Sequence, residues 1–384
     1  MRLEEALRRN GLAAIAEVKR RSPSAGDLRP DADPAALAAA YERSGAAAVS
    51  ILVDERFGGS WDDLRAARSA TRLPLLAKGF FSLDEHLREA REAGADAALL
   101  ILRDLDDASA RRLLGVASEL GLDALVEVHD REELARALAL DAPVLGINAR
   151  DLSTFEVDRK AQLELVARAA GSRVIVAESG IESRAQGAEA ELARADAILV
   201  GSALMRASDP ADKLAQLLSR PLVKVCGLTR EEDVAVAAEA GADLAGFILV
   251  EASPRKAAAV LDVPETMLSV AVYVGERGDD GGDLVQLYGE QEGKVRGRDG
   301  VLLRGEQQVA RVLDLPWQED DPAHLERARA VEGRVVLAGG LDAENVRAAI
   351  EAVRPWAVDA SSRLEREPGI KDAERVRAFV EAAR

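Results

Sequence analysis

The chain has 384 residues, enough for two domains at roughly 100 to 200 residues per domain. Its formal net charge of −17 argues against a general nucleic-acid or anionic-membrane surface, because both would repel it. Hydrophobic residues make up 48% and charged residues 31% of the chain, which indicates a folded globular protein and excludes a largely disordered one.

Cysteine and histidine are scarce. The single cysteine, Cys226, excludes an intramolecular disulfide, and the three histidines are too scattered to predict a zinc site. We therefore expect no metal and no cofactor. Residues 1–10 lack the apolar core of a signal peptide, and no apolar run reaches transmembrane length. We expect a cytoplasmic monomer that has no nucleic-acid or membrane partner.

The first half of the chain alternates short apolar runs with longer segments of helical periodicity. Segments such as residues 33–45 carry apolar residues at spacings of three and four and end at glycine, as helices do. Eight consecutive strand and helix units predict a (β/α)₈ TIM barrel over residues 1–219. The eight expected strands are AAIAEVK at 13, AAAVSILV at 46, LPLLAKGF at 73, AALLIL at 97, DALVEVH at 123, VLGINAR at 144, VIVAESG at 174 and AILVGSAL at 197.

The second half, residues 220–384, repeats this scheme with a shortened middle. Only about 20 residues separate Gly289 from Ala310, too few for two ordinary strand and helix units. The fold class expected for the chain is therefore α/β, two tandem (β/α)₈ TIM barrels, the second trimmed in its middle. The expected strands are LVKVCGL at 222, LAGFILV at 244, MLSVAVYV at 267, LVQLYG at 284, ARVLDLPW at 310, RVVLAGG at 334 and AVDASS at 357, with GVLLRG at 300 a possible further one.

Polar residues gather at the ends of the expected strands of the first half. Catalytic groups of such barrels lie at these C-terminal strand ends. Any one of these residues alone is more simply explained as a rim salt bridge, but the whole set indicates a site. Small residues in ESGI and GSAL would let backbone NH groups approach a phosphate. The set is Glu17, Lys19, Lys78, Glu127, Asn148, Arg150, Glu178, Ser179, Gly201 and Ser202.

Seven motifs of the first half resemble, in order and spacing, those of indole-3-glycerol-phosphate synthase. They are IAEVKRRSPSAGDL, SILVDERFGGS, LLAKGF, LVEVHD, GINARDL, VAESGI and LVGSALM, spread over nearly all of residues 13–206. The resemblance implies that carboxyphenylamino-deoxyribulose phosphate condenses, loses carbon dioxide and then loses water to give the indole.

The resemblance also implies the role of each residue. Lys78 would be the general acid of ring closure, and Glu127 would act in the proton transfers of dehydration. Glu17 and Asn148 would position or polarise the leaving hydroxyl. The remaining residues would bind the substrate. Its carboxylate and phosphate would be bound by Lys19 and Arg150, its phosphate also by Ser179, Gly180, Gly201 and Ser202, and its anthranilate ring by Phe57, Phe80 and Leu99. Ser22 and Glu178 complete the set. A core role is the alternative for the three apolar residues.

Two departures from the family predict slower turnover or weaker substrate binding. The family usually has aspartate after the catalytic lysine, whereas this chain has Gly79, so a charge that could tune Lys78 is missing. A helical extension before the first strand helps to cover the substrate in the family, and here residues 1–10 stand in that place.

Five motifs of the second half resemble phosphoribosylanthranilate isomerase, which catalyses the preceding step. They are VKVCGLTREEDV, GFILVEASPR, VLDLPW, VLAGGLDAENV and VDASSRLEREPGIKD, and their order after the first set matches a known bifunctional fusion. The resemblance implies an Amadori rearrangement without a cofactor. Cys226 would be the base, Asp314 the acid and Arg255 the partner of the anthranilate carboxylate. Phosphate would bind at Gly339, Gly340, Ser361 and Ser362.

The second half also departs from its family. Asp314 is followed by LPWQEDD in place of a glycine-rich loop, and Tyr288 stands where the family has histidine. Arg363 replaces a glycine of the phosphate loop after strand eight. This arginine would either block the phosphate loop or add a positive charge to it. Three hypotheses follow. The chain is a bifunctional enzyme, or a synthase whose second half is a non-catalytic scaffold, or a generic sugar-phosphate isomerase barrel. The ordered motifs of the first half argue against the third.

Overall fold

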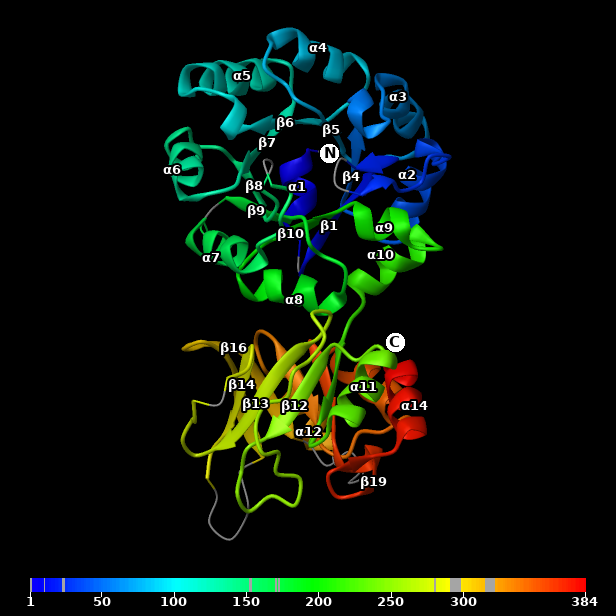
Figure 1. Cartoon of the computed structure of the whole chain (residues 1–384), viewed down its shortest axis with the longest axis vertical. Helices are drawn as coiled ribbons and strands as arrows, with labels where there is room; N and C mark the ends of the chain where they lie inside the picture. The colour runs from blue at the N-terminus through cyan, green and yellow to red at the C-terminus, as the bar shows by residue number, and fades with distance from the viewer. Residues whose placement is uncertain are drawn as a thin grey trace. The chain divides into compact units, whose positions relative to one another are not determined.

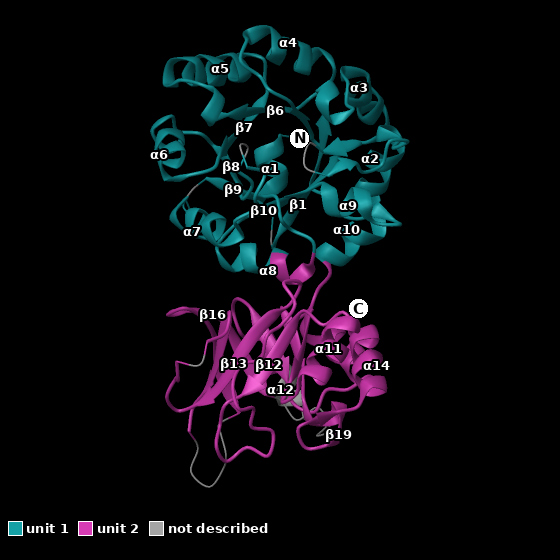
Figure 2. Ribbon diagram, in the orientation of Figure 1, with its two compact units in different colours: residues 1–182, 187–218 teal, residues 183–186, 219–384 magenta. Residues whose placement is uncertain are grey.

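The computed structural model describes residues 2–9, 11–22, 25–151, 154–169, 171, 173–279, 281–290, 298–314 and 322–384, with the side chains of 322–325 left aside. The chain forms two compact units, Met1–Glu182 with Gly187–Leu218, and Ser183–Gln186 with Ser219–Arg384 (Figure 2). We propose the boundary between the two barrels after residue 219, as the restart of the strand pattern predicts.

The first unit is a closed barrel of eight parallel strands, which confirms the eight expected runs. Each strand is buried along its length because side chains fill the inside and helices cover the outside; only Lys78 is partly exposed. The strands are β1 (Ala13–Val18), β4 (Ala48–Leu52), β5 (Leu75–Lys78), β6 (Ala97–Ile101), β7 (Asp123–Val128), β8 (Val144–Asn148), β9 (Val174–Glu178) and β10 (Ala197–Val200).

Amphipathic helices surround these strands (Figure 1). Several begin at an aspartate whose carboxylate accepts bonds from the first free backbone NH groups, as Asp33 does for α2 and Asp130 for α6. The helices are α2 (Pro34–Arg43), α3 (Trp61–Ala70), α4 (Asp84–Glu92), α5 (Asp107–Glu119), α6 (Arg131–Ala139), α7 (Arg159–Ala169), α8 (Arg184–Leu192), α9 (Ser202–Arg206) and α10 (Pro210–Leu218), with short 3₁₀ turns η1 (Glu55–Phe57) and η2 (Leu102–Asp104).

The short helix α1 (Leu3–Leu7) closes the N-terminal end of the first barrel. Leu3 and Leu7 are fully buried against residues that begin the strands, among them Ala13, Ala48, Ala97, Val144, Val174 and Ala197. Asp123 anchors the helix, accepting bonds from the Glu4 NH at 3.1 Å and from Arg2 Nε at 2.7 Å. This N-terminal helix therefore lies at the end of the barrel away from the C-terminal strand ends.

The second unit is also a closed barrel of eight strands, but its fifth strand runs backwards. The run GVLLRG forms β15, which pairs antiparallel with both β14 and β16. A tight hairpin needs only a few residues, whereas a parallel crossover needs a dozen or more, so the short segment could not hold two strand and helix units. The strands are β11 (Leu222–Cys226), β12 (Leu244–Ile248), β13 (Leu268–Val274), β14 (Leu284–Tyr288), β15 (Asp299–Arg304), β16 (Gln307–Asp314), β17 (Val335–Ala338) and β18 (Ala357–Ala360).

The trimming extends to the helices. Between β12 and β16 the described residues form no helix, which confirms that the middle of the barrel is reduced. The helices of this unit are α11 (Glu231–Glu239), α12 (Pro322–Arg329), α13 (Val346–Val353) and α14 (Ala373–Ala383), with a 3₁₀ turn η3 (Ser362–Leu364) and a small hairpin of β19 (Glu365–Glu367) and β20 (Ile370–Lys371).

Candidate active sites

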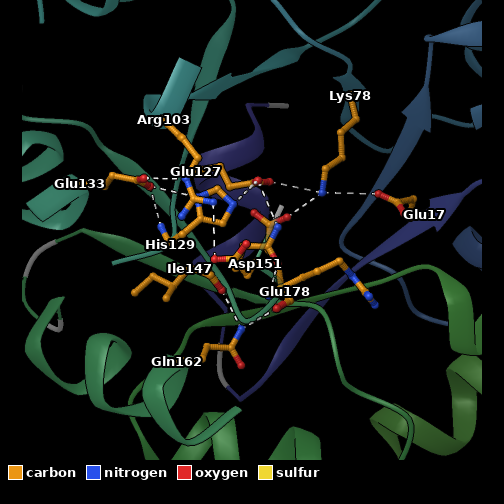
Figure 3. A network of polar contacts seen from close by, with 12 residues as sticks. Glu17, Lys78, Arg103, Glu127, His129, Glu133, Ile147, Asp151, Gln162 and Glu178 are labelled. Carbon is orange, nitrogen blue, oxygen red and sulfur yellow. Dashed lines mark hydrogen bonds and ion pairs between the residues drawn. The ribbon is translucent and has the colours of Figure 1, made fainter. Parts of the chain in front are cut away.

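Lys78 lies at the centre of the predicted site in the first barrel (Figure 3). Its ammonium donates a hydrogen bond to Glu178 Oε2 at 2.6 Å. The same Nζ lies 3.6 Å from Glu17 Oε2 and 3.7 Å from Glu127 Oε2. The three buried carboxylates come from the ends of β1, β7 and β9. The barrel thus brings three predicted carboxylates, far apart in the sequence, around the positive charge of Lys78.

Two glycines leave the space that these carboxylates occupy. A Cβ placed at Gly146 would lie 2.0 Å from Glu178 Oε1, and one placed at Gly201 would lie 2.4 Å from Glu17 Oε1. Both separations are far below van der Waals contact, so a larger residue would displace a carboxylate. Gly201, which the sequence assigns to phosphate binding, therefore has a packing role as well.

Burial and neighbouring charges separate the pKa values of the three carboxyl groups. Burial raises the pKa of Glu178 to about 8, and the nearby charge of Glu127 adds to this against the opposing effect of Lys78. For Glu127, burial is outweighed by Lys78 and His129, which lower its pKa to about 2. For Glu17, burial is likewise outweighed, by Lys19 and Lys78, so its pKa falls below the ordinary value. Of the three carboxyl groups, Glu178 is therefore the one that binds a proton most readily.

Lys78 stays charged beside them. Burial lowers the pKa of its ammonium, but Glu178, Glu17 and Glu127 together raise it above the ordinary value of a lysine. Lys19 supplies a second positive charge, with Nζ 3.0 Å from Glu17 Oε1. The predicted positive charges thus lie next to the predicted carboxylates.

The two oxygens of Glu127 have different surroundings. Oε1 accepts a hydrogen bond from Asn148 Nδ2 at 3.1 Å and lies 3.2 Å from His129 Nε2. Oε2 is buried and has no hydrogen-bond partner among the described residues, although it lies 3.7 Å from Lys78 Nζ. One oxygen is therefore anchored, while the other forms no hydrogen bond with the described residues.

Three residues that sequence reasoning missed support this site. Ser50 donates a hydrogen bond to Glu17 Oε2 at 3.4 Å. Gln162 Nε2 donates to the carbonyls of Ile147 and Glu178 at 2.7 and 2.6 Å, joining the ends of β8 and β9. Only His129 had a signal in the sequence, because it follows Glu127 by two residues and strand side chains alternate with that period.

Aromatic side chains follow β4 and β5. The rings of Phe57 and Phe80 stack with centroids 6.3 Å apart, and the Arg56 guanidinium lies 4.0 Å above the Phe80 ring. The side chain of Phe80 is exposed. Leu99 lies elsewhere, within the barrel interior in the cluster that includes Leu3 and Leu7. The structure thus pairs two of the three predicted apolar residues and places the third in the core.

The glycine in place of the family's aspartate has a packing explanation. A Cβ at Gly79 would lie 2.8 Å from Phe81 Cε1. The Phe81 ring is buried and stacks on Trp61 with centroids 5.9 Å apart. An aspartate at residue 79 would therefore require Phe81 to move.

The residues predicted to hold phosphate follow β8, β9 and β10. Ser179 and Gly180 both adopt left-handed backbone angles, with φ of 68° and 69°. Gly201 and Ser202 form the start of α9. Burial lowers the pKa of the Arg150 guanidinium, and the nearby positive charge of Arg206 lowers it further.

Ser22 lies on the chain that leaves β1. It is buried in the two-residue strand β2 (Arg21–Ser22), which pairs with β3 (Gly26–Asp27).

In the second barrel, Cys226 and Asp314 end β11 and β16. Cys226 is buried, and burial raises the pKa of its thiol, while the Lys224 ammonium opposes that rise. Lys224 Nζ donates hydrogen bonds to Gln286 Oε1 at 2.7 Å and to Asp359 Oδ2 at 2.8 Å. Sequence reasoning missed Lys224, Gln286 and Asp359, since they are single polar residues within apolar strands.

The family's histidine is replaced by a residue that joins this network. Tyr288 is buried at the end of β14, and its hydroxyl accepts a hydrogen bond from Gln286 Nε2 at 2.8 Å. Gly246 makes room on the other side, because a Cβ there would lie 2.7 Å from Cys226 Sγ. Cys226 thus lies beside Lys224, whose hydrogen bonds lead to Asp359 and, through Gln286, to Tyr288.

Arg255 is held by a carboxylate in the structure. Its Nε donates to Glu365 Oε1 and Oε2 at 3.0 and 2.8 Å. Lys371 Nζ also donates to Glu365 Oε1, at 2.8 Å. The cation predicted for the anthranilate carboxylate is therefore already oriented by its own chain.

One of the predicted phosphate loops of the second barrel contains a buried serine hydroxyl that has no hydrogen-bond partner among the described residues. Ser361 Oγ is buried without a hydrogen-bond partner among the described residues, and a Cβ at Gly227 would lie 2.7 Å from it. Gly339 and Gly340 both have positive φ angles, 114° and 75°. Ser362 and Arg363, in η3, have exposed side chains, so Arg363 does not fill the interior of the loop.

Comparisons with known proteins agree with both halves. Residues 1–217 match the family model of indole-3-glycerol phosphate synthase, and residues 321–382 match that of N-(5′-phosphoribosyl)anthranilate isomerase. An indole-3-glycerol phosphate synthase of Leptothrix cholodnii is 50% identical over 54% of this chain and 79% of its own length. A multifunctional tryptophan biosynthesis protein of Phycomyces blakesleeanus is 31% identical over 98% of this chain, which spans 63% of that protein.

Solved structures similar to part of the chain include a phosphoribosyl anthranilate isomerase from Thermotoga maritima, 26% identical over 43% of this chain and 98% of its own, with a TM-score of 0.33. No helix among the described residues is both long and apolar enough to cross a membrane. The chain belongs to the indole-3-glycerol phosphate synthase family, and the match of residues 321–382 to phosphoribosylanthranilate isomerase supports a bifunctional enzyme of tryptophan biosynthesis.

Proposed function

We propose that Lys78 is the general acid of ring closure in the first barrel, and the convergence of three buried carboxylates on its ammonium carries this proposal. As the aromatic carbon attacks the ketone, negative charge develops on the ketone oxygen, and a fixed ammonium stabilises it and donates a proton. Burial raises the pKa of Glu178 to about 8, and its Oε2 lies 2.6 Å from Lys78 Nζ, so Glu178 is placed to pass a proton back to the lysine afterwards.

The later steps use the remaining carboxylates. Once carbon dioxide has left, dehydration needs a proton donor for the departing hydroxyl and a base for the proton on the new ring. We assign the base to Glu127, whose Oε2 is ionised and accepts no hydrogen bond from the described residues. Glu17 and Asn148 would position the hydroxyl, since Glu17 is held by Lys19 and Asn148 by Glu127.

Substrate binding would divide among the rim residues. Arg150 and Lys19 would meet the carboxylate and phosphate groups, and Phe57 and Phe80 would contact the anthranilate ring. Ser179, Gly180, Gly201 and Ser202 would hold the phosphate through backbone NH groups and hydroxyls. Ser22 remains a proposed member of the binding set, whereas the burial of Leu99 with Leu3 and Leu7 supports the alternative core role.

For the second barrel we propose Cys226 as the base and Asp314 as the acid of the Amadori rearrangement. The acid opens the furanose by protonating the ring oxygen, and the thiolate removes the proton from the neighbouring sugar carbon. Lys224 beside Cys226 supports this assignment, because its positive charge favours the thiolate. Arg255 would face the anthranilate carboxylate, and Gly339, Gly340, Ser361 and Ser362 the phosphate.

Two assays of the unmodified chain test the pair of activities. Phosphoribosylanthranilate should be converted to the rearranged intermediate, a reaction measured by the loss of the substrate's fluorescence. The intermediate should then be converted to indole-3-glycerol phosphate, a reaction measured by absorbance. Isomerisation at the background rate would instead mean that the trimmed second barrel is a scaffold. We also propose a cytoplasmic monomer, for which sedimentation equilibrium should give the mass of one chain.

A further inference from the structure

A network of charged side chains leads from Glu127 to the segments after β6 and β8 (Figure 3). His129 follows the end of β7, two residues beyond Glu127, and its side chain is only 3% exposed. Its Nε2 lies 3.2 Å from Glu127 Oε1, and its Nδ1 lies 3.0 Å from Glu133 Oε2. The imidazole is therefore buried between two carboxylates.

The second carboxylate is itself held in place. Glu133, in the first turn of α6, also accepts a hydrogen bond from the backbone NH of His129 at 2.8 Å. Arg103, in η2, donates to Glu133 Oε1 at 3.1 Å, and its guanidinium lies 3.9 Å from Asp151 Oδ2. His129 is therefore oriented by a partner that has little freedom to move.

The surroundings favour the imidazolium form. An imidazole nitrogen that faces a carboxylate must carry a proton to interact favourably. Nδ1 forms a hydrogen bond with Glu133, and Nε2 lies within ion-pair distance of Glu127 Oε1 without forming a hydrogen bond to it. Burial lowers the pKa of His129, but Glu127 and Glu133 outweigh burial and raise it to about 9. At neutral pH the ring therefore places a positive charge against one oxygen of Glu127.

We infer that His129 is a positioning residue for Glu127: held by Glu133, it fixes Oε1 and leaves Oε2 to exchange a proton with the substrate. This inference rests on the role proposed for Glu127. Asn148 supports the same oxygen from β8, and Lys78 faces the other from β5. The charged groups that surround the pair are Lys78, Glu17 and Glu178 from the barrel interior, Glu133 from α6, and Arg103 and Asp151 from the segments after β6 and β8.

The inference predicts a change in the pH profile of indole formation. A base works only when ionised, so activity falls as the pH drops through the pKa of Glu127. The imidazolium lowers that pKa, and its removal would raise it. The acid limb of the profile should therefore move to higher pH when the positive charge is lost.

The test variant is His129→Gln, which keeps an amide donor near Glu127 but removes the charge. We expect kcat for indole formation to fall roughly tenfold at neutral pH, where Glu127 stays ionised, because its Oε1 is no longer held in place. The acid limb of the profile should also move upward by about one pH unit. His86→Gln is the matched control, because His86 lies on α4 outside the network. An unchanged kcat and pH profile in His129→Gln would overturn the inference.

A measurement on the unmodified chain avoids any folding defect of the variant. The chain has three histidines, so His86→Gln and His324→Gln assign two of the ¹⁵N signals and leave that of His129. We expect both ring nitrogens of His129 to be protonated at pH 7, and a neutral ring would contradict the inference. Glu127→Gln distinguishes a failure of the role proposed for Glu127 from a failure of the role inferred for His129. If this variant retains indole formation, the proposed role of Glu127 itself is wrong, whatever the result for His129.

Discussion

At the scale of single residues, both barrels place a lysine where it controls the ionisation of its neighbours. Lys78 lowers the pKa values of Glu17, together with Lys19, and of Glu127, while burial raises the pKa of Glu178. Burial raises the pKa of the Cys226 thiol, and the positive charge of Lys224 opposes that rise. These effects need no cofactor, because a desolvated ammonium changes the pKa of a nearby group strongly.

Replacing Lys224 tests this control in the second barrel. Lys224→Gln keeps a donor for Asp359 but removes the charge, so the pKa of Cys226 should rise further. Because the base must be a thiolate, isomerase kcat/KM rises with pH through the pKa of Cys226, and in the variant this rise should begin at higher pH. If the profile moves up by about one pH unit, kcat/KM at pH 7.5 should fall roughly tenfold. An isomerase pH profile identical to that of the unmodified chain would disprove the assignment, and indole formation serves as the internal control.

At the scale of the elements, the strand ends and their glycines decide which side chains can meet. Gly146 on β8 leaves room for Glu178 on β9, and Gly201 after β10 leaves room for Glu17 on β1. The second barrel uses the same device, since Gly246 on β12 lies against Cys226 on β11. Because β15 is antiparallel to β14 and β16, the chain needs no long crossover connection there, and the barrel still closes.

Gly146→Ala should disturb the first site without unfolding the barrel. The added methyl group would displace the Glu178 carboxylate from Lys78, and overpacking of this kind costs about 1 to 3 kcal/mol. We expect kcat for indole formation to fall at least roughly tenfold, since proton transfer depends on that contact. Gly115→Ala is the control, because nothing lies within 4 Å of a Cβ there. Steady-state kinetics and urea unfolding would measure both effects, and an equal kcat in the two variants would contradict the packing argument.

At the scale of the whole molecule, each unit has its own core and its own candidate site. Substitutions in one barrel should therefore leave the reaction of the other intact. Lys78→Ala should abolish indole formation and retain isomerisation, whereas Cys226→Ser should do the reverse. Assays of both reactions on each purified variant, with circular dichroism to show that it is folded, make the comparison. Loss of both reactions in a folded variant would refute two separate sites.

Sequence alone determined the two-barrel organisation and most candidate residues. Apolar runs at regular spacing reflect strand burial, and motifs such as LLAKGF and LVEVHD place charged residues at strand ends, where a local pattern suffices. What the tertiary structure decided depends on contacts between distant segments. In the structure β15 runs antiparallel to its neighbours, and Leu99 lies in the core. Gly79 leaves room for Phe81, and His129, Lys224 and Gln286 belong to polar networks. Barrel closure creates these contacts, and with them the desolvation that sets each pKa, so no short stretch of sequence could reveal them.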